Sequence, residues 1–128
     1  NGENVDRLQS RIKRDEDRLD NSTATLNFAL AEYTMIFEDE FAREALDKVS
    51  VATDKIHMKM YKLYKDGLDN KEMSKADAYN ALCRIRVMVL KIDAMSNWYS
   101  NELDKRINGY QTPTVYKPSK LVAKLSNK

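Results

Sequence analysis

The longest regular pattern in the sequence is an apolar stripe between residues 26 and 63, a stretch without glycine or proline. Its members recur every three or four residues, the spacing that places side chains on one face of an α-helix. They are Leu26, Leu30, Tyr33, Phe37, Phe41, Ala45, Val49, Ala52, Ile56, Met60 and Leu63. We therefore expect one helix over about residues 25–65, about 60 Å long at 1.5 Å per residue. Either this helix breaks near residues 48–50, or the molecule is elongated and buries the flanks of the helix against other copies.

A shorter apolar stripe with heptad-like spacing precedes the long one and predicts a first helix over about residues 3–20. Apart from an interruption at Asp15, its members are Val5, Leu8, Ile12 and Leu19. Residues 20–23 are all types that favour the N-cap position of a helix, so we expect a break or a kink there. The alternative is a continuous helix in which Ser22 and Thr23 face the solvent.

A third apolar stripe follows a predicted loop over residues 66–70, where Gly67 is placed to cap the end of the preceding helix. Ser74 and Asp77 resemble a capping box and mark the start of the third helix. The spacing of the stripe averages about 3.5 residues, which is typical of helices packed side by side. Its members are Ala78, Leu82, Ile85, Val89, Ile92, Ser96, Tyr99 and Leu103. Residues 108–109, an Asn-Gly pair, end the helix.

Composition agrees with an all-α fold of three main helices, one of them long. The 128 residues include only 3 Gly and 2 Pro, too few turn residues for a sheet protein. Charged residues make up 33%, and no apolar run reaches the length of a membrane span. The single cysteine, Cys83, excludes an intramolecular disulfide, and we expect it to be a small buried side chain. A single cysteine fits a reducing compartment, so we expect a cytoplasmic protein.

Few residues in the sequence are suited to catalysis. The one histidine, His57, has only Asp54 at a spacing that suits a helical metal site, and one pair does not make a site. The acidic residues between Glu38 and Glu44 are typical of a solvated helix face. No glycine-rich phosphate loop is present. We therefore predict a protein that is not an enzyme and that uses no metal and no cofactor.

Residues 110–128 differ from the helical domain that we predict over residues 1–109. They contain both prolines, four lysines and no acidic residue. We expect an extended strap as far as residue 118, followed by a short amphipathic helix capped by Ser119. So short a helix is not stable alone in water, so we expect it to dock on the third helix or to form subunit contacts in a homo-oligomer. The side chains assigned to oligomerisation are Leu121, Val122 and Leu125.

A basic ridge near the end of the long stripe is the main candidate for a binding site. Its lysines lie at helical spacing beside two tyrosines. Lysines neutralise phosphates, and exposed rings stack on unpaired bases, so the ridge suits single-stranded nucleic acid. The candidate contacts are Lys55, Lys59, Lys62 and Lys65 for phosphates, with Tyr61 and Tyr64 for bases. The alternative interpretation is a solvated helix end, because cations are favourable near a helix C-terminus.

Four stretches of the chain resemble, in order and approximate spacing, the UvsY-type recombination mediators of T-even-like phages. They are Leu8-Gln9 with Lys13 and Asp15, then Asp20 with Ser22-Thr23 and Leu26, then Met58-Lys59 through Tyr64 to Gly67, and finally Leu90-Lys91-Ile92-Asp93 with Trp98-Tyr99. The family's basic motif has a Lys and an Arg two positions apart. Lys59 matches that Lys, Tyr61 stands where the Arg would be, and Lys62 follows one position later.

The resemblance implies a small helical protein that forms a ring-like homo-oligomer, in which the C-terminal region assists assembly. Such proteins bind single-stranded DNA and help to load a recombinase onto strands covered by single-strand-binding protein. We therefore expect a non-enzymatic DNA-binding protein that acts as a recombination mediator. The alternative is a small helical phage or bacterial adaptor or inhibitor that binds a host protein through its acidic segment over residues 38–44.

Overall fold

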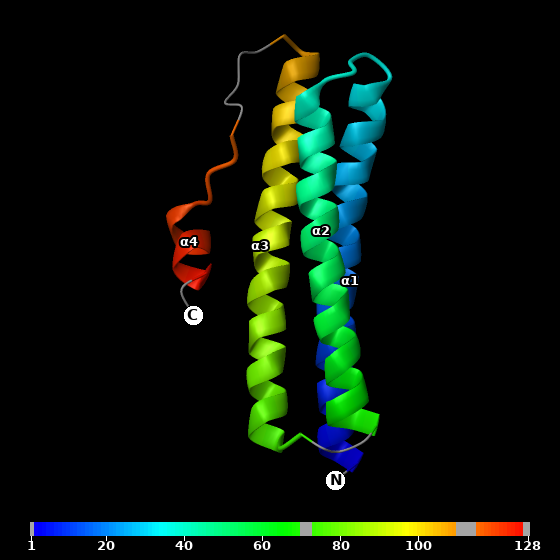
Figure 1. Ribbon diagram of the computed structural model, residues 1–128, viewed down its shortest axis with the longest axis vertical. Helices are drawn as coiled ribbons and strands as arrows, with labels where there is room; N and C mark the ends of the chain where they lie inside the picture. The colour runs from blue at the N-terminus through cyan, green and yellow to red at the C-terminus, as the bar shows by residue number, and fades with distance from the viewer. Residues whose placement is uncertain (1, 70–72, 110–114, 127–128) are drawn as a thin grey trace.

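The computed structural model describes residues 2–69, 73–109 and 115–126, and every regular element in these ranges is helical. The three long helices are α1 (Gly2–Thr34), α2 (Glu40–Leu63) and α3 (Lys75–Ile107). They lie side by side in one bundle, with α2 antiparallel to its two neighbours (Figure 1). A short helix, α4 (Lys120–Ser126), packs against α3. The prediction of an all-α fold with three main helices and a short C-terminal helix is confirmed.

Helix α1 continues without interruption through residues 20–23, so the predicted break or kink there is wrong. The hydroxyl groups in this segment do not cap a new helix, because they bond to carbonyl groups one turn back. The Thr23 hydroxyl donates to the Asp20 carbonyl at 3.1 Å, and the Ser22 hydroxyl lies 3.0 Å from the Arg18 carbonyl. The alternative of a continuous helix is therefore correct, but it placed Ser22 in the solvent, whereas Ser22 is buried.

The chain reverses direction over residues 35–39, so the expected single helix over about residues 25–65 is wrong. Two backbone amides, those of Ile36 and Phe37, donate to the Tyr33 carbonyl and close the end of α1. Asp39 then caps α2, because its carboxylate accepts a hydrogen bond from the Ala42 amide at 3.1 Å. The Tyr33 hydroxyl donates to the same carboxylate and ties the two helices together. Residues 48–50, where a break was one of the two alternatives, lie inside α2.

The three apolar stripes meet in a single core. All eight members of the α3 stripe are buried, as predicted, and so are the described members of the first stripe. The side chain of Val5 lies outside those described. In the long stripe, Phe37 is 37% exposed because it falls in the reversal, and Ala52 is half-buried. The three- and four-residue spacing of the stripe continues through the turn. After the chain folds back, both halves of the stripe face the same core.

The connection between α2 and α3 begins with a π-helical turn, η1 (Tyr64–Asp69), rather than with the predicted loop. Gly67 lies inside this turn and is not the predicted cap, because the C-cap residue of α2 is Tyr64. A Cβ atom at Gly67 would lie 3.2 Å from Leu63 Cδ1, so the end of the Leu63 side chain would have to move by a few tenths of an ångström to admit it. The predicted cap of α3 is confirmed, since the Asp77 amide donates to the Ser74 hydroxyl at 3.1 Å.

The C-terminal segment returns along α3 (Figure 1). The first part of the predicted strap, residues 110–114, lies outside the described residues. Tyr116 holds the next part in place, because its ring lies 5.4 Å from Trp98 and 6.2 Å from Tyr99, measured between ring centroids. The predicted cap of α4 is confirmed, with the Val122 amide donating to the Ser119 hydroxyl at 3.2 Å.

Candidate nucleic-acid interface

Three of the four lysines of the basic ridge, Lys55, Lys59 and Lys62, line grooves between α2 and α3. Lys59 and Lys62 line a groove of about 530 Å³ between the two helices, to which α3 contributes Arg84. Two carboxylates, Asp66 and Asp77, also line this groove. We call it the basic groove. Its walls also include apolar side chains. Leu63 comes from α2, Met73 from the connection between η1 and α3, and Ala81 and Ile85 from α3.

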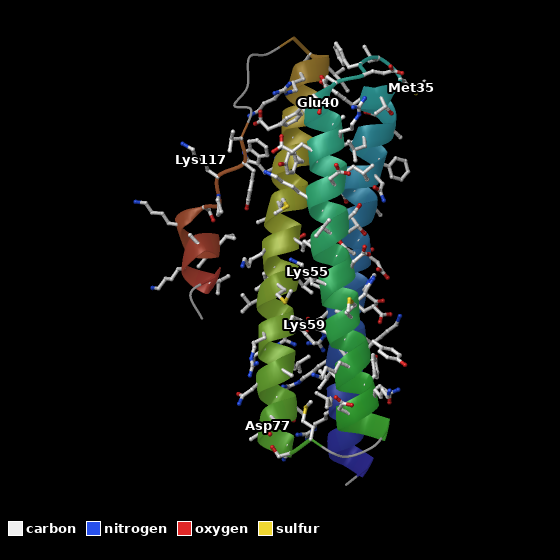
Figure 2. The ribbon with its side chains drawn as sticks, in the orientation of Figure 1. Met35, Glu40, Lys55, Lys59, Asp77 and Lys117 are labelled. Carbon is white, nitrogen blue, oxygen red and sulfur yellow. The ribbon has the colours of Figure 1, made fainter. Side chains whose placement is uncertain are left out.

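A second groove of about 510 Å³ lies further along the same pair of helices, and Lys55 is on its border. Lys48 and Lys91 are its other cations, and Asp47 is its carboxylate. We call it the apolar groove, because most of its remaining lining is aliphatic: Val51, Ala52, Ile56, Met88, Ile92 and Met95. Figure 2 shows Lys55 and Lys59 one above the other on α2, as their i, i+4 spacing requires.

Most cations of the two grooves have no carboxylate partner. Lys55, Lys59, Lys62 and Arg84 make no ion pair with any residue of the described ranges. Lys48 is different, because its ammonium lies 2.8 Å from Glu44, and the hydrogen bond to that carboxylate raises the pKa of Lys48. The positive charge along the grooves is therefore available to an anionic partner.

The structure does not bring all of the predicted site residues together. Tyr61 is 68% exposed but lines neither groove, since it lies two positions from Lys59 and about 200° around the helix. Tyr64 is half-buried against the core, and its burial raises its pKa, with a further contribution from Glu16 of α1. Tyr64 thus faces α1 rather than the grooves. Lys65 is exposed and also lies outside both linings.

Sequence analysis missed the two cations that α3 contributes, Arg84 and Lys91. A signal for them was present in the sequence. They are seven residues apart, so they share a face of α3, and each lies one position before a buried member of the stripe. What the sequence could not supply is the identity of the helix that this face borders.

The residues assigned to oligomerisation differ in their surroundings. Leu121 is 68% exposed, Leu125 is half-buried, and Val122 is 9% exposed on the helix that packs against α3. Only Leu121 leaves most of its side chain open to a second molecule. The burial of Val122 agrees with the other alternative, in which the C-terminal helix docks on the third helix of the same chain.

Other kinds of site find little support in the described ranges. No group of three or more His, Cys, Asp or Glu side chains in them is arranged to hold a metal ion. His57 is exposed, and Cys83 is exposed rather than buried as expected. None of the helices in these ranges combines the length and the hydropathy of a membrane span.

Comparisons with protein-family models, with curated proteins and with solved structures find no match to this chain.

Proposed function

We propose that the protein binds single-stranded nucleic acid along the face formed by α2 and α3. The observation that carries this proposal is the set of unpaired cations on the borders of the two grooves: Lys55, Lys59, Lys62 and Arg84. Lys55 and Lys59 follow each other at about 6 Å along the helix axis, so they form a track of charge rather than a single anion site. A phosphate backbone is the ligand that such a track fits.

The groups of this face have different tasks in the proposed complex. The lysines act as mobile point charges, whereas the planar guanidinium of Arg84 can hold two oxygens of one phosphate. Tyr61 lies off this face, about 100° around α2 from Lys62, and offers an exposed ring on which an unpaired base can stack. Lys65 extends the positive charge toward that ring. Neither kind of contact reads base edges, so we expect binding with little sequence preference.

The wider role that we propose, a recombination mediator, rests on the resemblance to UvsY-type proteins alone. In that role the protein would be a homo-oligomer that keeps hold of single-stranded DNA while a recombinase replaces single-strand-binding protein. No catalytic step is assigned to the chain.

A second candidate function is an adaptor or inhibitor that binds a host protein. The observation that favours it is the α1–α2 reversal, where exposed apolar and acidic side chains lie next to each other. Met35 is 87% exposed and Ile36 is 62% exposed, and both precede the exposed carboxylates of Glu38 and Glu40. Figure 2 places Met35 and Glu40 at the end of the bundle remote from Asp77, so the two candidate surfaces are far apart.

Charge reversal in the basic groove tests the first proposal and separates it from the second. In the double variant Lys59→Glu/Lys62→Glu, we expect the affinity for oligo-dT at low salt to fall at least about tenfold, because two phosphate contacts become repulsions. The slope of log affinity against log salt should flatten by about 0.7 for each lost contact. Fluorescence anisotropy over a range of salt concentrations measures both quantities.

Matched variants make the test specific. Arg84→Glu should weaken binding and flatten the salt slope, whereas the same substitution of Arg14, which is also an exposed arginine but belongs to α1, should change neither. Tyr61→Ala should weaken binding by about 1–3 kcal/mol per stacked base and leave the salt slope unchanged. Circular dichroism must show that each variant is folded. A folded double variant that binds oligo-dT like the parent would overturn the proposal and leave the adaptor as the better candidate.

A further inference from the structure

A second apolar stripe runs along the outer face of α1, opposite the one that is buried, and ends in the turn that follows the helix. Its members are Ala24, Phe28, Ala31 and Met35, all of them exposed. Phe28 is 77% exposed and Met35 is 87% exposed, although both are large apolar side chains. Phe28 lies two positions from the buried Leu26, so it points about 200° away from the core. Packing within one copy of the chain therefore does not explain this outer stripe.

The surroundings of the outer stripe are acidic. Residues 19–42 contain five acidic residues and no Lys or Arg. Of these, Asp20 and Glu32 are exposed and share the solvent side of α1 with the stripe. The outer face of α1 is thus an amphipathic surface on which exposed apolar side chains lie beside carboxylates.

The apolar groove between α2 and α3 has the complementary properties. Its lining exposes aliphatic side chains, of which Val51 is 55% exposed, and its borders carry Lys48, Lys55 and Lys91. No residue of α4 lines it, so within the described residues it is open along its length. An amphipathic helix that lays its apolar face into such a groove would bring its acidic flanks to Lys55 and Lys91, the two lysines that have no ion-pair partner among the described residues, whereas Lys48 is already paired with Glu44.

We propose that the outer stripe of α1 of one copy docks in the apolar groove of a second copy. Apolar side chains then meet apolar lining, and acidic flanks meet lysines, on both sides of the contact. The lengths also agree, since residues 24–34 span about 15 Å of helix and residues 47–56 span about 14 Å. The stripe of a chain points away from its own core, so it reaches a groove only on another molecule.

The two surfaces are different, so the contact is heterologous and every copy offers both a donor and an acceptor. This inference does not rest on nucleic-acid binding. The contact covers Lys55, but it leaves Lys59, Lys62 and Arg84 of the basic groove uncovered. It also does not use the C-terminal helix. The contact involves only about three turns of helix on each side, which is a small interface, so we expect weak association that grows with concentration.

A mixing experiment with two variants tests this arrangement. Phe28→Asp removes the donor and leaves the acceptor intact, whereas Val51→Asp does the reverse. Each variant alone should show a dissociation constant at least about tenfold higher than that of the parent by sedimentation equilibrium. An equimolar mixture should form a dimer with nearly the parent's affinity and should stop at two molecules, because only one intact donor–acceptor pair remains. Met58→Asp is the matched control, since Met58 is 72% exposed on α2 and lines neither groove.

Each outcome decides the proposal. Concentration-dependent association in the parent, its loss in both single variants and its return in the mixture would support the heterologous contact. A parent that stays monomeric up to about 1 mM would overturn it, as would variants that associate like the parent. Variants that fail to recombine on mixing would also overturn it, because they would indicate a contact of like surfaces. Both substituted side chains are exposed, and the milder pair Phe28→Gln and Val51→Gln repeats the test if either aspartate variant loses its helical circular dichroism signal.

Discussion

The two seams that α3 makes with its neighbours are built differently. Polar cross-links close the seam with α1: Arg86 reaches the buried Asp15 at 3.4 Å, and Asp93 accepts from the Ser22 hydroxyl at 2.6 Å. Arg18 adds a contact of 3.3 Å to the same Asp93. No ion pair joins α2 to α3 in the described ranges, and below their aromatic end this seam opens into the two grooves.

This contrast indicates where the molecule meets its partners. In the α1–α3 seam, charged groups find their partners within the chain, so the seam contributes to folding. In the α2–α3 seam, the border cations other than Lys48 have no ion-pair partner among the described residues, and aliphatic side chains remain partly exposed. The nucleic-acid proposal therefore concerns the open seam for its charge, and the proposed contact between copies concerns it for its apolar lining.

The largest expected difference between the seams is in stability. Leu19→Ala empties a fully buried position of α1 and should lower the free energy of unfolding by about 2–5 kcal/mol. Val51→Ala removes a side chain that is 55% exposed on the border of the apolar groove, and it should change stability by no more than about 0.5 kcal/mol. Urea denaturation followed by circular dichroism measures both. Equal losses would mean that the open seam is packed like the closed one.

A smaller difference is expected for carboxylates. Asp93→Ala removes the shared acceptor of the α1–α3 seam and should lower the free energy of unfolding by about 1–2 kcal/mol, since hydrogen bonds to charged groups are lost. The matched variant Asp47→Ala removes an exposed carboxylate from the apolar groove and should be nearly neutral. The comparison fails if Asp47→Ala is as costly as Asp93→Ala in the same denaturation assay.

The smallest effect should come from alkaline pH at the aromatic end of the α2–α3 seam. Burial raises the pKa values of Tyr99 and Tyr116 above 10.0, although Lys48 partly offsets the shift of Tyr99. The folded state therefore favours the neutral phenols. This stabilisation is fully present below the unfolded pKa of about 10 and is lost as the pH rises through the folded values.

The free energy of unfolding should consequently fall above about pH 10, and the fall should be shallower in Tyr99→Phe. At neutral pH this variant should cost little, because the buried Tyr99 hydroxyl has no hydrogen-bond partner in the described ranges. Urea denaturation at several pH values on either side of 10 checks both statements. An identical alkaline slope in parent and variant would exclude Tyr99 as a contributor.

The apolar spacing predicted which side chains are buried better than it predicted where the chain turns. The eight stripe residues of α3 are all in the core, and Ser74 caps that helix as expected. The reversal after Tyr33 was missed because the stripe passes through it in steps of four and no Gly or Pro marks it. Its only local signal is Asp39, an N-cap residue that is hidden between Glu38 and Glu40.

The candidate site was predicted in part for the same reason. Helical spacing was enough to group Lys55, Lys59 and Lys62, since they belong to one helix. It was not enough to add Arg84, which lies more than twenty residues later in the sequence, or to place Tyr64 against α1. Residues of different helices meet only through the rotation of each helix about its axis and the choice of its neighbours.

The sequence by itself determined the helical class, the buried face of each helix and the cap of α3, because these depend on local periodicity and on hydrogen bonds between near neighbours. The tertiary structure decided that one long stripe becomes two antiparallel helices, that Ser22 is buried and bonded to Asp93, and that cations of α2 and α3 share one face. An apolar stripe predicts which side chains are buried. It does not predict which other stripe they pack against, because that depends on how the three helices pack together and leave one seam open.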